Sequence, residues 1–362
     1  MLVDPILLLI VVAGGAHLSF WIVLVSNLAY LQRSRPSAPS TYPSVSICIP
    51  ARNEADNLRR LLPSLANQEY PDLEIIVLDD GSEDDTWTVL ENAETDRLTA
   101  LRGDGPPTGW VGKVHALYQC TRSATGTLYL FLDADAVLTD PEAIKRLVDR
   151  HRGAPTEVSS GFPHLRGGAM LLVSLVPHAL LRSLPWPLVH RTKAAALSAL
   201  NGQCWLINAA LYHQLEPHET VKDAVLEDVE IGRYLKRAGY PPTLLDVQDL
   251  VAVHMYDSFR EAWRGLRKNT YLLLGGTPVQ FGLLYAGFVL TWVVAPFLSW
   301  WFLVSLYGLK LVTDRASGMP IFVTLLAPVS YILALILQLD SAIHHWLGQV
   351  TWKGRSVGSE TP

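Results

Sequence analysis

Acidic side chains stand at the ends of two apolar runs in the middle of the chain. Asp79 and Asp80 directly follow the run LEIIVL, and Asp133 and Asp135 follow the run LYLFL. Short apolar runs of this kind are typical of buried strands, and in an open α/β sheet ligands bind at the carboxyl ends of the strands. Both acidic pairs are therefore expected to border one crevice. Carboxylate oxygens bind hard divalent cations, which would offset the charge of a nucleoside diphosphate; the alternative is a turn with acidic caps.

A third acidic pair, Glu227 and Asp228, begins the segment EDVEIGRYLKRAG. Ile231 and Leu235 give this segment an apolar side and Gly239 would end it, so a helix is predicted. The structural explanation of the pair is that a helix N-terminus favours negative charge. The chemical explanation is a general base, because a carboxylate near an acceptor group can remove its proton. The two explanations are compatible.

Strand-like and helix-like segments alternate around these acidic pairs. The expected strands are 44–49, 73–78 and 128–132, and the expected helices are 53–68, 84–93 and 111–122. This alternation predicts an α/β domain whose parallel strands are joined by crossover helices.

The chain has too few charged residues for a purely soluble protein, and the deficit is concentrated. Charged residues make up 17% of the chain, against about 25% in soluble domains. Residues 5–32, 269–309 and 316–339 contain none. The first stretch exceeds the roughly 20 residues that cross a bilayer and lacks the flanks of a cleaved signal, so it is expected to be an anchor. Arg33 and Arg35 follow it, which predicts a cytoplasmic central domain.

The later apolar stretches leave the number of crossings open. Residues 319–339 have the length of one span, whereas 279–309 is long for one span and short for two. One tilted span or a tight hairpin fits the longer stretch. Lys353 and Arg355 favour a cytoplasmic C-terminus, and therefore an even number of crossings after the central domain. The apolar segment 169–190 is interrupted by prolines and Arg182 and is expected to lie in the membrane interface.

Charge and cysteine content exclude several classes of protein. The formal net charge is −5, whereas binding of nucleic acid requires a basic face, so no nucleic-acid partner is expected. No GxxxxGK[ST] sequence is present, which excludes a P-loop NTPase. Cys48, Cys120 and Cys204 have no metal-site spacing and are expected to be buried, reduced thiols on the cytosolic side.

Six motifs in this order resemble family 2 glycosyltransferases of the GT-A fold. They are PxRNE (50–54), VLDDGSxDxT (77–86), GWVGK (109–113), DAD (133–135), NGQCWL (201–206) and LED (226–228). The resemblance covers about residues 44–270, two-thirds of the chain. It implies an α/β GT-A nucleotide-diphospho-sugar transferase domain with N- and C-terminal transmembrane helices. The anchor, the GWxGK and GQxxL motifs and the C-terminal spans further resemble membrane enzymes that glycosylate carotenoids, hopanoid-associated lipids or ceramide.

The resemblance implies roles on the donor side of the site. Pro50, Arg52 and Glu54 match the loop that surrounds the nucleotide base, and Asp80 matches the residue that contacts uracil. Lys113 is placed to approach the diphosphate.

The same resemblance implies a metal site and an acceptor side. Asp133 matches the ribose-side acid and Asp135 the ligand of Mg²⁺ or Mn²⁺. His254 ends an apolar run and is either a further metal ligand or a structural histidine. For the acceptor side, Asp228 matches the catalytic base of inverting members, and Gln203, Trp205 and Glu227 are expected to face the acceptor.

One motif departs from the family pattern. Processive members carry (Q/R)xxRW after the base helix, whereas this chain has Arg264, Arg267 and then Lys268 in place of the tryptophan. Arg264 and Arg267 are expected either to meet the diphosphate, since guanidinium groups suit phosphate oxygens, or to be cations at the membrane surface. The missing tryptophan disfavours a processive polysaccharide synthase.

The function expected from these features is transfer of a hexose, with glucose as the first candidate, from a UDP-sugar to a hydroxyl or carboxyl of a membrane lipid such as a carotenoid. A polysaccharide synthase and a non-catalytic nucleotide-binding scaffold are the alternatives. The expected location is the inner membrane, with several crossings and the catalytic domain in the cytoplasm. The expected domains are an anchor (1–35), the catalytic domain (36–268), two or three spans (269–345) and a polar tail (346–362).

Overall fold

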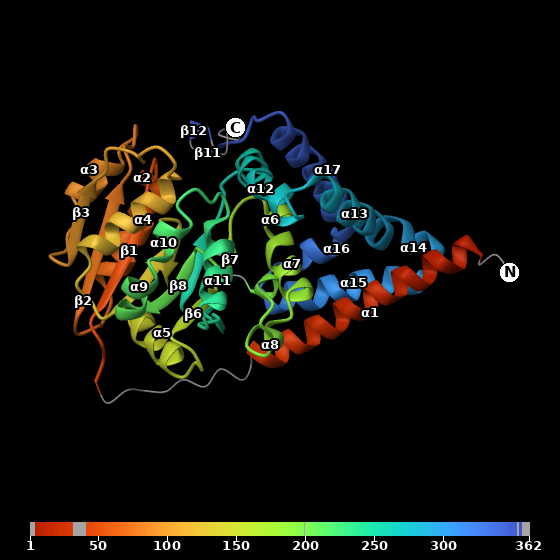
Figure 1. Cartoon of the computed structure of the whole chain (residues 1–362), viewed down its shortest axis with the longest axis horizontal. Coiled ribbons are helices and arrows are strands. Elements are labelled where there is room, and N and C mark those ends of the chain that lie inside the picture. The colour runs from red at the N-terminus through yellow and green to blue at the C-terminus, as the bar shows by residue number, and fades with distance from the viewer. Residues whose placement is uncertain (1–3, 32–40, 199, 353–354, 357–362) are drawn as a thin grey trace. The chain divides into compact units, whose positions relative to one another are not determined.

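The protein divides into an α/β unit and a helical unit, whose elements are labelled in Figure 1. The computed structural model describes residues 4–31, 41–198, 200–352 and 355–356. The α/β unit comprises Tyr30–His164 and Trp186–His254, and the helical unit comprises Met1–Ala29, Leu165–Pro185 and Met255–Pro362. Arg33, Arg35, Lys353 and most of the expected linker and polar tail lie outside the described residues, so the charge argument for orientation stays a prediction.

Seven strands form the sheet of the α/β unit. Their order is β3 (Leu98–Arg102), β2 (Leu73–Asp79), β1 (Val45–Ala51), β4 (Leu128–Leu132), β8 (Cys204–Asn208), β6 (Val158–Phe162) and β9 (Thr243–Asp246). β1 pairs in parallel with β2 and β4, and β2 pairs in parallel with β3, as the sequence predicts. β8 runs antiparallel to both β4 and β6, however, so the sheet is mixed, a feature that the alternation of elements does not predict.

The reversal of β8 has a consequence for the site. In the α/β unit, the described residues shortly before β8 form α8 (Trp186–Val189) and a 3₁₀ turn (Ala195–Leu197). Because β8 is reversed, the NGQ residues before it lie at the edge where β1, β2 and β4 end.

Apolar residues at helical spacing build the helices of the α/β unit. α2 (Ala55–Ala66) buries Leu58, Leu61, Leu62 and Leu65, the leucines that predict it. The other helices are α3 (Thr86–Glu91), α4 (Gly112–Ser123), α5 (Ala143–Arg152), α9 (Ala209–Leu215), α10 (Pro217–Thr220) and α11 (Glu227–Arg237). The three cysteines are buried and free, as expected.

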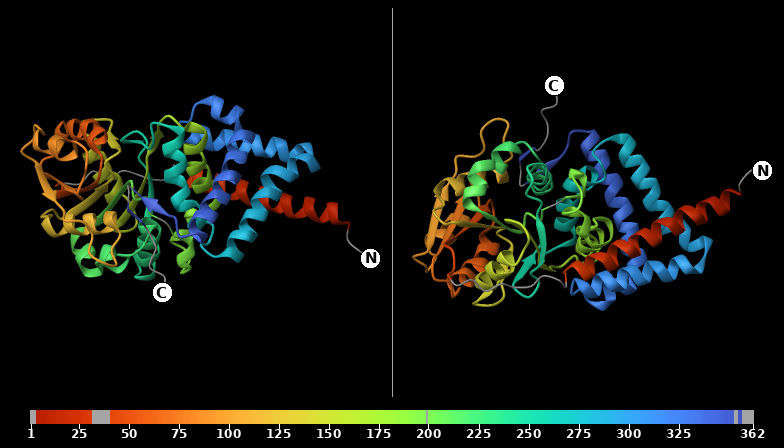
Figure 2. Two further views of the ribbon diagram at one scale, coloured as in Figure 1. Left: turned by 90° about the horizontal axis from the view of Figure 1, so that it is seen from above. Right: turned by 60° about the horizontal axis from the view of Figure 1, so that its bottom comes forward.

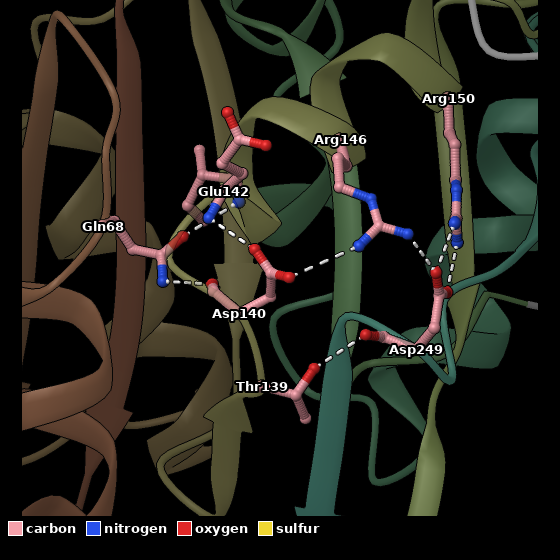
Figure 3. Close-up of polar contacts among 8 residues, drawn as sticks. Gln68, Thr139, Asp140, Glu142, Arg146, Arg150 and Asp249 are labelled. Carbon is pink, nitrogen blue, oxygen red and sulfur yellow. Dashed lines mark hydrogen bonds and ion pairs between the residues drawn. The ribbon is translucent and has the colours of Figure 1, made fainter.

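A polar network ties α2 and α5 to the turn after β9 (Figure 3). The Gln68 side chain donates to the carbonyl of Asp140 at 2.9 Å and accepts from the Ile144 N–H at 3.0 Å. Arg146 and Arg150 both bind the Asp249 carboxylate, at 2.5 and 2.7 Å. Asp249 lies two residues before the first residue of β10 (Val251–His254), which pairs antiparallel with β5 (Ala136–Leu138). The network therefore fixes the strand pair that follows the DAD motif.

The helical unit consists of helices from both ends of the chain and from its middle, seen from two further sides in Figure 2. They are α1 (Pro5–Leu31), α6 (Met170–Val173), α7 (Leu175–Ser183), α12 (Phe259–Leu273), α13 (Pro278–Val289), a π-helical turn (Leu290–Val294), α14 (Ala295–Leu298), α15 (Trp300–Ala316), α16 (Ile321–Leu325) and α17 (Ala327–Trp346). The chain passes between the units at β7 (His164–Arg166). Within the described residues, three helical segments are long and apolar enough to cross a membrane: Pro5–Leu31, Pro278–Leu298 and Ala327–Trp346.

The middle and C-terminal segments differ in detail from the expectation. The segment 169–190 is three short helices rather than one, and its residues up to Pro185 group with the helical unit. The stretch 279–309 is broken at Ser299, whose backbone is extended, so α14 and α15 are separate helices. Pro296 stands in the first turn of α14, where its missing N–H costs no helical hydrogen bond.

Candidate functional site

Lys113 joins the end of β4 to the start of α11. Its Nζ lies 2.7 Å from Oδ1 of Asp133 and 3.0 Å from Oε1 of Glu227. The lysine stands in the first turn of α4, and this turn is held by the Val111 N–H, which donates to the carbonyl of Lys222 at 2.7 Å. The sequence predicts Lys113, Asp133 and Glu227 as site residues from three separate motifs, and the structure brings them into contact.

The balance of charge keeps Lys113 protonated. Burial alone would lower the pKa of Lys113, but the negative charges of Asp133 and Glu227 outweigh burial and hold its pKa well above the usual value. The side chain is mostly buried, with 17% of its surface exposed. The edge of the sheet therefore carries a fixed cation between carboxylates, in a place where ion pairs are weakly screened.

Asp228 begins α11 beside this ion cluster. The Gly202 N–H donates to its Oδ2 at 3.3 Å, and the Val229 N–H donates to its Oδ1 at 2.8 Å. Burial, and then the negative charge of Glu227, raise the pKa of Asp228 to about 6, against the opposing effects of Lys113 and of the two N–H groups. A carboxylate with a pKa near 6 is ionised at neutral pH and basic enough to accept a proton during a reaction.

Gly202 allows the NGQ turn to approach the cluster. A Cβ atom at this position would lie 3.3 Å from Nζ of Lys113 and 3.3 Å from Cβ of Asp228. Asn201 holds the turn, because its N–H donates to the Ser160 hydroxyl at 2.8 Å and its side-chain amide to the Gly161 carbonyl at 3.0 Å. The sequence pattern assigns no role to Asn201 or Gly202. The available signal is a glycine two residues before a strand, since glycine allows another group to approach the backbone closely.

The PxRNE and DDGS motifs form a second group at the same edge. Arg52 donates from Nη1 to the carbonyls of Asp80 and Gly81, at 2.7 and 3.0 Å. Asn53 has a φ of +52°, in the left-handed region that asparagine tolerates, and its side chain accepts from the Glu83 N–H. The Glu54 N–H donates to Thr86 at 2.8 Å. The loop is thus ordered by its own backbone and side-chain hydrogen bonds.

Pro50 and Asp80 complete this group. Pairing of β1 with β4 stops at Cys48, while pairing with β2 continues to Ala51, so Pro50 lies where its missing N–H disrupts only one neighbour. The Asp80 N–H donates to the carbonyl of Ala51 at 2.8 Å, and the Asp80 side chain is buried. The expected contacts of Pro50, Arg52, Glu54 and Asp80 with a nucleotide stay predictions.

The residues expected to hold a metal are Asp135 and His254. The His254 N–H donates to the carbonyl of Asp135 at 2.9 Å, one step beyond the pair Ala136 and Val253 of the β5–β10 ladder. Directly opposed residues of an antiparallel pair project to one face, so these side chains share a face. The described residues contain no group of three His, Cys, Asp or Glu side chains gathered as a metal cluster. One carboxylate and one imidazole fit a cation whose remaining ligands come from a diphosphate and water.

Trp205 lies in the core of the α/β unit rather than on the expected acceptor side of the site. Its side chain is 1% exposed and stacks on Phe131 at 4.1 Å in the core. The two residues are register partners on β8 and β4, so they project to the same buried face. Gln203, before the strand, lies at the edge, where its carbonyl accepts from the Asp133 N–H at 3.3 Å. Trp205 therefore packs in the core next to the site, and the prediction that it contacts the acceptor is wrong.

A buried histidine that no sequence motif singles out lies near the cluster. His218 on α10 is fully buried. Its ring forms a hydrogen bond of 2.8 Å with the Tyr212 hydroxyl, and the ring centre lies 5.1 Å from that of Phe131. Burial lowers the pKa of His218 to about 3, so the ring is neutral. Nothing in the spacing of this histidine distinguishes it from any other core residue.

Arg264 and Arg267 lie on α12, in the helical unit. Arg267 is 3.5 Å from the Asp340 carboxylate of α17, which also accepts from the Trp263 ring N–H at 2.7 Å. Arg267 thus has an acidic partner within its own unit. A role of either arginine at the diphosphate stays a prediction.

A mixed α/β sheet with acidic side chains at the carboxyl ends of β2 and β4 is the arrangement of a GT-A glycosyltransferase. Residues 46–215 match the model of the family described as glycosyl transferase family 2. Its fold is also that of a solved mannosyltransferase of Pyrobaculum calidifontis, crystallised with GDP-Man and Mn²⁺: the TM-score is 0.57 and the identity 19%, over 96% of this chain and all of the other.

Two staphylococcal proteins give the relation in sequence. A 4,4'-diaponeurosporenoate glycosyltransferase of Staphylococcus haemolyticus is 23% identical over 346 residues, which are 87% of this chain and 88% of that protein. The protein of the same name from Staphylococcus aureus strain USA300 is 25% identical over 244 residues, which are 65% of this chain and 62% of that protein. This chain is a glycosyltransferase related to those carotenoid glycosyltransferases.

Proposed function

We propose that this protein is a membrane-bound, inverting glycosyltransferase that moves a hexose, with glucose as the first candidate, from a UDP-sugar to a membrane lipid such as a carotenoid. The observation that carries the proposal is the contact of Lys113 with Asp133 and Glu227, beside Asp228. A nucleotide-binding scaffold requires neither a carboxylate with a raised pKa nor a cation held next to it.

The proposed reaction is a single displacement at the anomeric carbon. The acceptor oxygen forms a bond to that carbon while the bond to the nucleoside diphosphate breaks, and UDP leaves. Asp228 accepts the proton of an acceptor hydroxyl. Lys113 offsets negative charge on the departing diphosphate, and Arg52 holds the Asp80 loop against the base. A divalent cation bound by Asp135 and His254 would stabilise the leaving diphosphate; Mn²⁺ accompanies the nucleotide sugar in the mannosyltransferase of the same fold.

A carboxyl acceptor differs from a hydroxyl acceptor in its need for a catalytic base. The two staphylococcal relatives are named for diaponeurosporenoate, a carboxylate. A carboxylic acid is already ionised at neutral pH and attacks without losing a proton. Asp228 is then unnecessary as a base, so loss of its charge would impair transfer to a hydroxyl much more than transfer to a carboxylate.

The proposed architecture follows from the apolar helices. Residues 1–35 would anchor the protein, the catalytic domain would comprise 36–268 in the cytoplasm, and two crossings among Pro278–Leu298 and Ala327–Trp346 would follow. An apolar acceptor could then meet a cytosolic donor at the membrane surface. A polysaccharide synthase is the weaker candidate, because Lys268 replaces the tryptophan of processive enzymes.

The proposal is tested with membranes that contain the wild-type protein, the Asp135→Ala variant or no added protein. Each is given Mn²⁺, a carotenoid acid or alcohol, and radiolabelled UDP-glucose, UDP-galactose or GDP-mannose. We expect label from a UDP-sugar in the organic phase, lost on chelation and reduced in the variant. Label confined to an insoluble polymer would establish the synthase instead. Absence of transfer from every donor, with folded protein present, would refute the enzyme proposed here.

A further inference from the structure

A buried arginine of the helical unit is surrounded by aromatic rings. Arg182, on α7, is 8% exposed. Its guanidinium carbon lies 4.6 Å from the ring centre of Phe20 on α1 and 4.7 Å from that of Trp292 in the π-helical turn. The two rings stack on each other, with centroids 5.4 Å apart and planes inclined by 13°. Two of the three candidate spans therefore supply the surroundings of this charge.

A second buried cation of the helical unit, Lys310, has an acidic partner, whereas Arg182 has none among the described residues. Lys310 of α15 is fully buried and bound to Asp314 one turn further along, with Ser174 at 3.1 Å. Arg182 has no such carboxylate: among the described residues it makes no ion pair or hydrogen bond, and its Nε is buried without a partner. A buried charge without a counter-ion is costly, and within a membrane region an ionisable side chain is usually functional.

The geometry limits which chemical group could accept the hydrogen bonds of Arg182. Ring faces attract a guanidinium group, but they do not accept hydrogen bonds from the N–H groups that lie in the guanidinium plane and form its fork. A planar carboxylate or a phosphate accepts two of those bonds at once. The partly exposed Phe20 ring would at the same time contact the apolar part of a ligand, whereas Trp292 is buried and also stacks on Tyr331 at 4.6 Å. Arg182 is therefore matched to an anionic oxygen group attached to an apolar chain.

We propose that Arg182, which lies against the rings of Phe20 and Trp292, binds the carboxylate or phosphate group of an amphiphile. The group could belong to an acidic polyene, in which case the site selects the acceptor and that reading rests on the proposed function. It could equally be the headgroup of an anionic phospholipid. Binding itself is independent of sugar transfer, so Asp228→Asn leaves it intact even if the proposed reaction is wrong.

The test uses the full-length protein in phosphatidylcholine nanodiscs with retinoic acid and retinol as probes. These share one polyene and differ in the carboxylate, and both absorb tryptophan emission, so quenching reports binding. We expect wild type to bind the acid at least about tenfold more tightly than the alcohol, since hydrogen bonds to a charged group have this strength. Arg182→Gln should lose the preference, whereas Arg315→Gln, which changes an exposed arginine of the same unit, should keep it.

A second reading identifies a headgroup. Nanodiscs with phosphatidylglycerol should raise the unfolding temperature of wild type, but not of Arg182→Gln, if the ligand is a phosphate. If Arg182→Gln does not fold, Arg182→Lys decides, because it keeps the charge and loses the fork; its acid preference or its phosphatidylglycerol effect should fall at least threefold. Equal binding of acid and alcohol together with no Arg182-dependent lipid effect would overturn the proposal, as would variants that retain either effect in full.

Discussion

Four side chains from three motifs meet at the edge of the sheet, and their charges determine one another. Lys113 contacts Asp133 and Glu227, while Asp228 stands next to Glu227 at the start of α11. Residue types and order were enough to select all four. Their contacts could not be read from the sequence, because Lys113 lies 20 positions from Asp133 and 114 positions from Glu227, and only the fold brings them together.

The pH dependence of the reaction should report the pKa of Asp228. That pKa is raised to about 6, so the fraction of active base grows as the pH rises through 6 and levels off above it. Glu227→Gln removes a neighbouring negative charge and should move the acidic limb of kcat/KM to lower pH. Glu230→Gln, on the same helix turn and outside the cluster, is the control. A limb that does not move in Glu227→Gln would show that another group titrates.

Gly202→Ala should impair catalysis more than folding. The new Cβ would lie 3.3 Å from both Nζ of Lys113 and Cβ of Asp228, which requires these groups to give by a few tenths of an ångström. Small displacements of catalytic groups are costly, and we expect kcat to fall by about tenfold. The change in unfolding temperature should be slight. Gly282→Ala, which meets open space, is the matched substitution, and an equal loss of activity in both variants would contradict the packing argument.

At the scale of elements, the sequence predicted the strands and helices better than the sheet. Apolar runs located β2 and β4 within a residue, and leucine spacing located α2. The antiparallel direction of β8 was missed, because side-chain alternation is the same in either direction. Trp205 was misplaced for a related reason: the motif shows that a strand is present, but the face on which a residue lies depends on its partner, here Phe131.

Asp249 should stabilise the strand pair that follows the DAD motif. It accepts from Arg146 and Arg150, and the hydrogen bond of Arg150 holds the pKa of Asp249 below its usual value. Since the carboxylate is about half exposed, we expect Asp249→Asn to lower the free energy of unfolding by only about 0.5–1 kcal/mol. The difference from wild type should be present at neutral pH and vanish as the pH falls through the lowered pKa.

The measurement is urea denaturation at several values of pH. Asp56→Asn breaks a single exposed pair with Arg59 and should have almost no effect. A destabilisation by Asp249→Asn that persisted in full below the lowered pKa of Asp249 would mean that the side chain acts by packing rather than by charge.

At the scale of the whole molecule, composition alone separates the candidate membrane segments from the α/β domain. It could not show that residues 165–185, in the middle of the sequence, group with the N- and C-terminal helices. Their short helices and mixed polarity give no clear period, and the buried contacts of His178 with Thr313 and Tyr331 join positions 135 and 153 residues apart.

The proposed orientation predicts a protected catalytic domain. In intact spheroplasts, external protease should leave residues 41–268 uncut, and the domain should become sensitive after lysis. The protein should also stay in the membrane fraction after alkaline carbonate treatment, because three apolar helices resist extraction. A marker protein of the periplasmic side serves as the control. Digestion of the α/β domain in intact spheroplasts would reverse the orientation.

The central claim is that Asp228 is the base of a glycosyl transfer, and Asp228→Asn tests it most directly. Asparagine keeps the size of the side chain and can still meet the Gly202 N–H with its carbonyl, but it cannot accept the proton. With an alcohol acceptor, we predict that kcat falls by about 10²–10⁴, while the dissociation constant of UDP-glucose, measured by titration, changes less than about threefold. A variant that retains wild-type kcat with that acceptor would contradict the account.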